Sequence, residues 1–259
     1  MARIYLDATP VLHGERAVRR NTTNLYRHLE RDNLDADRVF VVSHGVDSMF
    51  HPLGPAEARA AVHARFGFQQ PYLLDVGVLA RHKNITGLLR MFSHLRHTHP
   101  DLDLVMVGPN GSATEEVTNA VASSSLATRA RCVGAVATDE PILLALYNAS
   151  ELLVHLSYYE GWCAPPLEAL ACGIPVVLAD IPPLREVGGD AASYAPANEP
   201  AQAAMAVARL PEDSSYREAK IRAGLRVAAA HPWADAAQNF GRASYRGSWR
   251  MDNQEGTTL

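Results

Sequence analysis

The sequence predicts an α/β fold in which a parallel β-sheet carries helices on both faces. From Pro71 onward, apolar runs of strand length alternate with amphipathic stretches of helix length. The runs are apolar throughout, as in strands that are buried on both faces of a sheet. No hairpin signal joins one run to the next, so each strand must return through a crossover helix. These three observations together predict a parallel sheet.

The expected elements follow one another along the chain. The first part holds a strand at residues 3–8, a helix at residues 22–32 and a second strand from Arg38, and helical composition resumes after Pro55. Further strands are expected at residues 72–78, 102–108, 129–134, 151–157, 174–180 and 191–195. Further helices are expected at residues 84–97, 113–125, 140–150, 165–172, 202–209 and 216–230. Residues 251–259 are expected to form a flexible tail.

Composition and charge narrow the class of protein. The chain has 259 residues, of which 47% are hydrophobic and 20% charged, enough for one large domain or two smaller ones. The net charge is −4 and no lysine–arginine block appears, which argues against nucleic acid as a main partner. Three scattered cysteines indicate a reducing compartment. No apolar stretch approaches the ~20 residues that span a bilayer, so we expect a cytoplasmic protein, with peripheral membrane contact left open.

The segment YYEGWCAPPLEALACGIPVV, residues 158–177, carries two glutamates with seven residues between them. It follows a predicted strand and therefore lies at the carboxyl edge of the sheet, where parallel α/β proteins bind ligands. The amides of residues 161–164 and the N-terminus of the next helix suit an anion there. Glu168, expected in the first turn of that helix, can accept hydrogen bonds from a ribose diol, and Glu160 can do the same for a sugar ring. Taken singly, each glutamate is better explained by the helix dipole or a solvated loop.

Other patterns resemble functional motifs but have simpler explanations. The D-x-D pattern at residues 101–103 precedes a strand and is interpreted as strand entry, at the edge opposite the ligand. The histidines within residues 94–99 have metal-like spacing, and a solvated helix end explains them. The turn at residues 108–111 lacks the full dinucleotide fingerprint, which argues against a nicotinamide enzyme. Cys163 has no evident base in the sequence, so we expect burial or ligand contact there and no nucleophilic chemistry.

The two glutamates, the proline pair and the GIPVV strand together resemble the E-x7-E signature of retaining GT-B glycosyltransferases of family four. Other stretches follow that family's order, namely VGVLARHKNITGLL, LDLVMVG, DAASYAPANEP and a closing helix that begins near Trp233. The resemblance covers the chain from about His44 to Arg246. It implies Rossmann-like domains, a nucleoside diphosphate sugar as donor, a metal-independent reaction and no cofactor.

Carried over by position, the resemblance gives roles to particular residues. Lys83 matches the lysine that contacts the donor's diphosphate, Glu160 the glutamate near the donor sugar, and Glu168 the glutamate that binds the ribose. The loop whose amides meet the sugar and phosphates corresponds to Gly161, Trp162, Cys163 and Ala164. Lys83 and Glu160 are the expected catalytic residues, and no metal ligand is expected.

Two departures from the family concern these loops. Val78 follows the strand-end glycine, Gly77, at a position where the family usually has arginine or threonine. Arg81 can replace that residue from a shifted position, so Arg81 and Gly77 are counted with the donor-binding residues. The second loop has Cys163 where the family commonly has a glycine, and a cysteine held at positive φ would be strained.

The resemblance also implies an unequal division of the chain. Residues 1–43 match a remnant of the acceptor-side domain, and residues 44–250 match the donor-binding domain. One hypothesis is therefore a glycosyltransferase, with mannose and glucose as the candidate sugars, that moves a hexose to a hydroxyl of a saccharide or another acceptor with retention of configuration. The other hypothesis is a weak or inactive nucleotide-sugar-binding homologue that needs a partner chain or an oligomer to bind the acceptor.

Overall fold

The computed structural model describes residues 44–96, 98–123 and 126–238. The strands and the helix expected before Val46, and the tail, lie outside the described residues. By its internal contacts the chain divides into two units: Val46–Pro232, and a second unit of Met1–Gly45 with Trp233–Leu259. Every helix and strand named below belongs to the first unit. In the second unit, the rings of His44 and Trp233 lie 5.7 Å apart between centroids.

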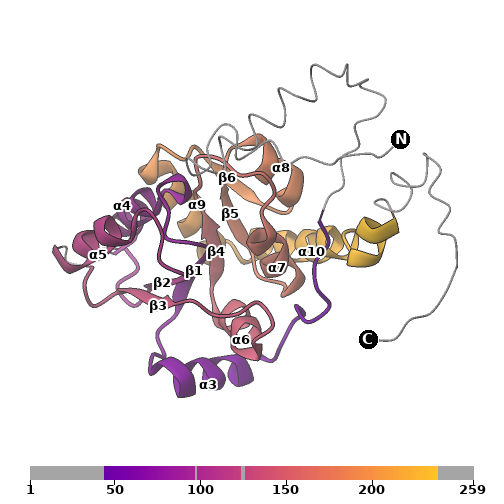
Figure 1. Ribbon diagram of the computed structural model, residues 1–259, viewed down its shortest axis with the longest axis horizontal. Helices are drawn as coiled ribbons and strands as arrows, with labels where there is room; N and C mark the ends of the chain where they lie inside the picture. The colour runs from indigo at the N-terminus through magenta and orange to yellow at the C-terminus, as the bar shows by residue number, and fades with distance from the viewer. Residues whose placement is uncertain (1–43, 97, 124–125, 239–259) are drawn as a thin grey trace, which may run out of the picture. The chain divides into compact units, whose positions relative to one another are not determined.

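The first unit is built on six strands that all run parallel (Figure 1). They are β1 (Tyr72–Val76), β2 (Asp103–Val107), β3 (Ala130–Gly134), β4 (Leu152–His155), β5 (Val176–Ala179) and β6 (Ser193–Ala195). Their order in the sheet is β3-β2-β1-β4-β5-β6. In the register, Leu73 of β1 lies opposite Leu104 on one side and opposite Leu152 on the other. The predicted Rossmann-like parallel sheet is confirmed, and its strand order reverses between β1 and β4.

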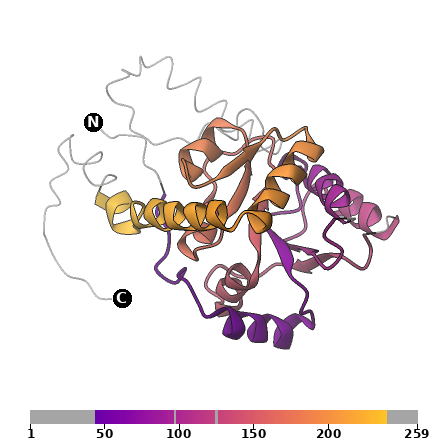
Figure 2. The same cartoon turned by 180° about the vertical axis from the view of Figure 1, so that it is seen from behind.

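Helices cover both faces of this sheet, as predicted. They are α3 (Pro55–Phe66), α4 (Ile85–Leu95), α5 (Thr114–Ser123), α6 (Pro141–Ala149), α7 (Ala164–Ala171), α8 (Pro182–Gly188), α9 (Pro200–Glu212) and α10 (Ser214–Ala229). Helices α4, α5 and α9 enclose one apolar core, and the other five enclose the second. Helix α10 packs along α7, which Figure 2 shows from behind. None of the described helices combines the length and the apolar character that a membrane span requires.

Each strand contributes to both cores, because successive side chains of a strand point to opposite faces of the sheet. Leu73 and Leu104 pack into the core beneath α4, α5 and α9, whereas Leu74 and Val105 pack into the core on the other face. All four side chains are at most 1% exposed. Burial on both faces explains why β1, β2, β4 and β5 are mainly apolar, whereas the edge strand β3 exposes three of its five residues.

Three details of the elements differ from, or add to, the sequence expectation. Helix α7 begins at Ala164, one residue earlier than expected, because a proline pair fits the first turn, where an N–H has no helical partner. Glu168 is consequently the fifth residue of α7, so its expected place in the first turn is wrong. Helix α8 is not among the expected elements, since its proline pair and closing glycine pair leave few residues that favour a helix.

The D-x-D pattern lies at the amino end of β2, as expected. Asp103 is the first residue of β2 and is 1% exposed, and its carboxylate pairs with Arg129 at 2.5 Å and with Arg131 at 3.3 Å. These two arginines satisfy a carboxylate that would otherwise be buried without a partner. The interpretation of this pattern as strand entry is confirmed.

Candidate active site

The loop between β1 and α4 presents Lys83. It contains a short 3-10 turn, η2 (Arg81–Lys83), that ends at Asn84, whose φ of +54° lies in the left-handed region. Asparagine tolerates that region better than most side chains do. The buried Asn84 amide donates hydrogen bonds to the carbonyl oxygens of Leu156 and Ala197, at 3.0 and 2.8 Å. Asn84 therefore anchors Lys83 beside the end of β4.

The ends of β1 and β2 approach closely at two glycines. The N–H of Gly77 donates to the carbonyl of Val107 at 2.8 Å. A Cβ on Gly108 would lie 1.9 Å from the Gly77 carbonyl oxygen, so no side chain fits at position 108. A Cβ on Gly77 would lie 3.6 Å from Cε of Lys83 and 3.8 Å from Cε1 of His155. Gly77 thus borders the groups that carry the chemistry of the site.

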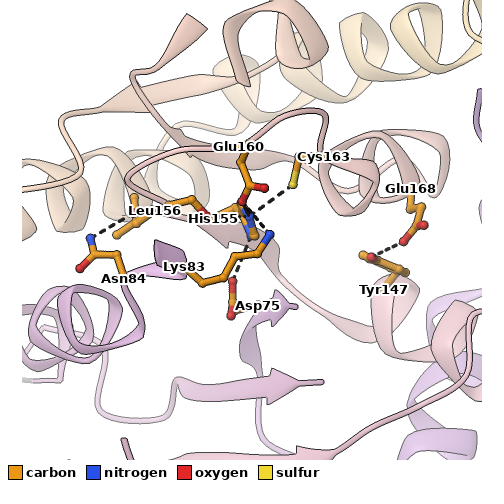
Figure 3. A network of polar contacts seen from close by, with 10 residues as sticks. Asp75, Lys83, Asn84, Tyr147, His155, Leu156, Glu160, Cys163 and Glu168 are labelled. Carbon is orange, nitrogen blue, oxygen red and sulfur yellow. Dashed lines mark hydrogen bonds and ion pairs between the residues drawn. The ribbon is translucent and has the colours of Figure 1, made fainter. Parts of the chain in front are cut away.

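Lys83 and Glu160 form an ion pair where β1 and β4 end (Figure 3). Nζ of Lys83 donates to Oε1 of Glu160 at 2.6 Å, although the two lie 77 positions apart in the sequence. Nε2 of His155 lies 2.9 Å from the same carboxylate oxygen. The side chains of Lys83 and Glu160 are only 13% and 7% exposed. The two expected catalytic residues are thus adjacent in the structure, at the point where parallel sheets of this order bind ligands.

His155, the last residue of β4, is the centre of this cluster and was not among the expected residues. Its Nδ1 lies 3.2 Å from Asp75 of β1, and its Nε2 lies 3.0 Å from Oγ of Ser157 and 3.3 Å from Sγ of Cys163. Cys163 is buried, as expected, and the base that the sequence did not reveal beside it is His155. The sequence did contain an indication of this contact. Asp75 and His155 each lie in an otherwise apolar strand, and a titratable side chain that is buried there needs a polar partner.

The cluster favours the charged form of each of its three main groups. Burial opposes the ionisation of Glu160, but the hydrogen bond and charge of His155 and the charge of Lys83 outweigh it and lower the pKa of Glu160 to about 2. Burial also opposes the charge on His155, yet Cys163, Asp75 and Glu160 raise its pKa well above 6.5. The pKa of Lys83 is raised too, since Cys163 and Glu160 outweigh its burial.

Glu168 lies apart from this cluster, with Tyr147 of α6 as its partner (Figure 3). The hydroxyl of Tyr147 donates to Oε2 of Glu168 at 2.6 Å. Burial raises the pKa of Glu168; the Tyr147 hydrogen bond opposes that shift and the charge of Asp47 adds to it. Burial and the neighbouring Glu168 raise the pKa of Tyr147 well above 10. Tyr147 is a second site residue that the sequence analysis did not identify.

The loop before α7 contains the remaining expected donor residues. Gly161 is exposed, and Trp162 is half-buried with its ring 6.2 Å from that of His231. Cys163 is the N-cap of α7 with φ −130°, so the expected backbone strain at this cysteine is absent. Ala164 is the first residue of the helix. The substitution of cysteine for a glycine therefore costs the loop no unfavourable backbone conformation.

Arg81 does not join the Lys83 cluster. Its side chain is 76% exposed, and its guanidinium lies 3.9 Å from Glu116 of α5.

Cavities of about 490 and 350 Å³ both include Pro71, the residue before β1, and so lie at the amino edge of the sheet. The carboxyl edge, where Lys83 and Glu160 meet, is the better candidate because it holds the titratable groups.

The fold and the site define a class of protein. An open parallel sheet whose strand order reverses between β1 and β4, with polar groups gathered at that point, is typical of nucleotide-binding domains. Residues 61–226 match the family model described as "Glycosyl transferases group 1". This chain belongs to that glycosyltransferase family, and its sheet is the Rossmann-like sheet of the GT-B fold.

Curated relatives agree with this assignment. The chain is 31% identical over 202 residues to O-antigen chain mannosyltransferase B of Escherichia coli, covering 78% of this chain and 52% of that protein. It is 32% identical over 247 residues to D-inositol 3-phosphate glycosyltransferase of Salinispora tropica, covering 90% of this chain and 51% of that protein. This chain thus spans about half the length of the curated relatives it matches.

Solved structures agree on the fold. Sucrose-phosphate synthase from Thermosynechococcus elongatus superposes with a TM-score of 0.70 at 24% identity, over 86% of this chain and 56% of that chain. The C-terminal domain of a glycosyl transferase group 1 family protein from Francisella tularensis superposes with a TM-score of 0.60 at 19% identity, over 72% of this chain and 97% of that domain. The chain therefore shares its fold with parts of these two structures.

Proposed function

We propose that this chain binds the donor in a glycosyltransferase reaction that moves a hexose from a nucleoside diphosphate sugar to an acceptor hydroxyl. We propose further that the reaction retains the anomeric configuration and needs no metal ion. The observation that carries the proposal is the contact of Lys83 with Glu160 at the switch point of the sheet, in a chain of this family.

Lys83 supplies the charge that such a reaction needs. The bond between the sugar's C1 and the diphosphate breaks, and the nucleoside diphosphate leaves with the bonding electrons. A cation that is already in position stabilises the negative charge that develops on the phosphate oxygens. Without donor, Glu160 neutralises Lys83; with donor, the diphosphate takes the place of that carboxylate. Glu160 keeps its contact with His155 and accepts hydrogen bonds from the sugar hydroxyls.

The two ends of the donor are held by the E-x7-E segment. Glu168 has one oxygen on Tyr147 and a second that is available to the hydroxyls of a ribose. The amides of residues 161–164 lie between the two glutamates and suit the phosphates and the sugar. Two of the relatives are named as mannosyltransferases, so mannose is the first sugar to test.

A second candidate is a donor-binding chain that depends on another chain for its acceptor. Every named strand of the described residues belongs to one sheet, and that sheet carries the proposed donor residues. In this case transfer requires a partner chain or a second copy that binds the acceptor. Measuring donor turnover with and without candidate partner chains separates the two candidates.

Thermal shift against UDP-, GDP- and dTDP-sugars tests donor binding directly, because a ligand that binds only the folded state raises its stability. We expect one nucleotide to raise the melting temperature, and Lys83→Met to lose that shift for the nucleoside diphosphate while the nucleoside alone binds as before. Equal losses for both ligands would remove Lys83 from the diphosphate. Turnover of the stabilising donor, with the product's anomeric configuration read by NMR and with chelator present, then tests transfer, retention and metal independence.

A further inference from the structure

Three potential metal ligands converge in the cluster around His155. Nε2 of His155 lies 2.9 Å from Oε1 of Glu160 and 3.3 Å from Sγ of Cys163, and the three atoms all lie within 4.8 Å of one another. The side chains come from the end of β4, from the loop after it and from the N-cap of α7. Short loops fix their separation, because all three residues lie within nine positions of the chain.

The contacts of Nε2 are more numerous than hydrogen bonding can use. One imidazole nitrogen offers a single proton or a single lone pair. Glu160, Cys163 and Ser157 all have a polar atom within 3.3 Å of this one nitrogen. A metal ion placed among these atoms would bind several of them at once. Tetrahedral zinc separates a nitrogen and an oxygen ligand by about 3.4 Å and a nitrogen and a sulfur ligand by about 3.6 Å. The observed distances of 2.9 and 3.3 Å are shorter, so the side chains must move apart by about 0.5 and 0.3 Å to hold the ion.

The other nitrogen of His155 is already oriented as in metal sites. Its Nδ1 lies 3.2 Å from Oδ1 of Asp75, and the two side chains are 1% and 3% exposed. A carboxylate on the far nitrogen of a ligating histidine fixes the ring and increases its basicity. Asp75 therefore supplies the outer contact of such a site, and it comes from a different strand than the three ligands.

We propose that His155, Glu160 and Cys163 bind a divalent transition metal ion of the zinc type, with Ser157 or water as the fourth ligand. Thiolate and imidazole ligands favour zinc and its neighbours over magnesium or calcium. The site is inhibitory, a statement that rests on the proposed function. The ion occupies the Glu160 oxygen that Lys83 otherwise contacts, so Glu160 is no longer available to the sugar and Lys83 must turn away.

Cobalt provides a test of the site that does not depend on activity. Reduced, chelator-treated full-length chain is titrated with Co²⁺ and followed by visible and near-ultraviolet absorption. We expect one equivalent to give tetrahedral cobalt bands together with a thiolate-to-cobalt charge-transfer band, and Zn²⁺ but not Mg²⁺ to displace the ion. Cys163→Ser should remove the charge-transfer band and weaken binding at least tenfold. Cys132→Ser, at the exposed cysteine of β3, is the matched control and should change neither.

A second variant tests the competition with Lys83. Lys83→Met removes the cation that occupies Oε1 of Glu160 and should tighten Co²⁺ binding several-fold, which a general structural defect would not do. No charge-transfer band in the wild-type chain, or an equal loss in Cys163→Ser and Cys132→Ser, would overturn the site.

Activity under zinc-buffered conditions tests inhibition. We expect donor turnover to fall at the free Zn²⁺ concentration at which the site fills, and Cys163→Ser to need at least tenfold more zinc for the same fractional loss. Turnover that is unchanged at full occupancy would overturn the inhibitory role. A chain that binds Co²⁺ through Cys163 but turns over no donor would leave the metal site in place and refute the proposed enzyme.

Discussion

Glu160 lies in the loop after β4 and Glu168 lies in the second turn of α7, and the two carboxylates differ in their partners. Glu160 contacts two cationic groups, Lys83 and His155, and its pKa is lowered to about 2. Glu168 contacts the neutral hydroxyl of Tyr147, and burial raises its pKa above 4.5. Seven residues separate the two in the sequence, yet folding stabilises the ionised form of one and the protonated form of the other.

This difference shows that the spacing of the two glutamates does not determine their ionisation. The E-x7-E pattern places one carboxylate in a loop and the other on the helix that follows. The groups that decide their charge come from other elements: Lys83 from the loop after β1, His155 from β4 and Tyr147 from α6. Changes at each partner therefore test the contrast between the two glutamates.

Glu160→Gln is expected to have the largest effect on stability. The amide leaves Lys83 largely buried without its countercharge and removes one of the two carboxylates beside His155, which keeps Asp75. Truncating a buried ion pair costs about 3–5 kcal/mol. We expect the free energy of unfolding to fall by about 3 kcal/mol in urea denaturation. Glu168→Gln is the matched control and should change it by less than about 1 kcal/mol, since no cation loses its partner. Equal losses in the two variants would contradict the contrast.

Glu168→Gln is expected to change how nucleotide binding depends on pH. The ionised form accepts hydrogen bonds from a ribose, so the affinity for the nucleoside diphosphate should fall as the pH drops through the raised pKa of Glu168. Glutamine should remove that step and weaken binding about tenfold at pH 8, the effect of one hydrogen bond to a charged group. Calorimetric titration from pH 4.5 to 8 measures both effects.

The raised pKa of Glu168 also determines how the stability of the fold changes with pH. The pKa of Glu168 is higher in the folded protein than in the unfolded chain, so the protonated carboxyl group stabilises the fold. This stabilisation is fully present below the pKa of the unfolded chain and is lost as the pH rises through the pKa of the folded protein. Glu168→Gln should therefore flatten the pH dependence of stability in this interval. An unchanged slope of stability against pH in the variant would show that another group titrates there.

Tyr147→Phe is expected to have an intermediate effect. It removes a partly buried hydrogen bond of 2.6 Å to Glu168, which should lower the free energy of unfolding by about 1.5 kcal/mol. Because that bond lowers the pKa of Glu168, its loss should also shift the pH step of nucleotide binding to higher pH. Tyr194→Phe removes an exposed hydroxyl contact to Gly189 and serves as the control, with an expected change within about 0.5 kcal/mol. A pH step that stays in place would separate Tyr147 from Glu168.

Arg81→Ala is expected to have the smallest effect. Its exposed guanidinium has only a 3.9 Å ion pair with Glu116, and surface pairs of this kind contribute less than about 1 kcal/mol. Nucleoside diphosphate affinity should change much less than in Lys83→Met when both variants are titrated side by side. A loss as large as that of Lys83→Met would place Arg81 in the donor site after all.

The class of fold could be predicted well because the patterns that specify it lie within short stretches of the sequence. Strands buried on both faces must be apolar throughout, and a parallel connection must contain a helix, so both features appear in the sequence itself. The predictions that were wrong concern single residues at the start of α7. The helix begins at Ala164 and not at Pro165, and Cys163 has an extended backbone conformation as its N-cap. Propensities give such boundaries only approximately, because neighbouring side chains decide which residue begins the helix.

The sequence by itself determined the class of fold and the edge of the sheet at which the candidate residues gather, and the resemblance to the family pointed to Lys83 and Glu160. It did not determine that these two would touch, or that His155 and Asp75 would join them. Those contacts link residues 77 and 80 positions apart and exist because the strand order places β1 beside β4. Periodicity reports which face a residue buries, whereas the neighbour of a strand is chosen by the packing of the whole sheet. The direction in which the pKa of each glutamate shifts was therefore decided by contacts that only the tertiary structure makes.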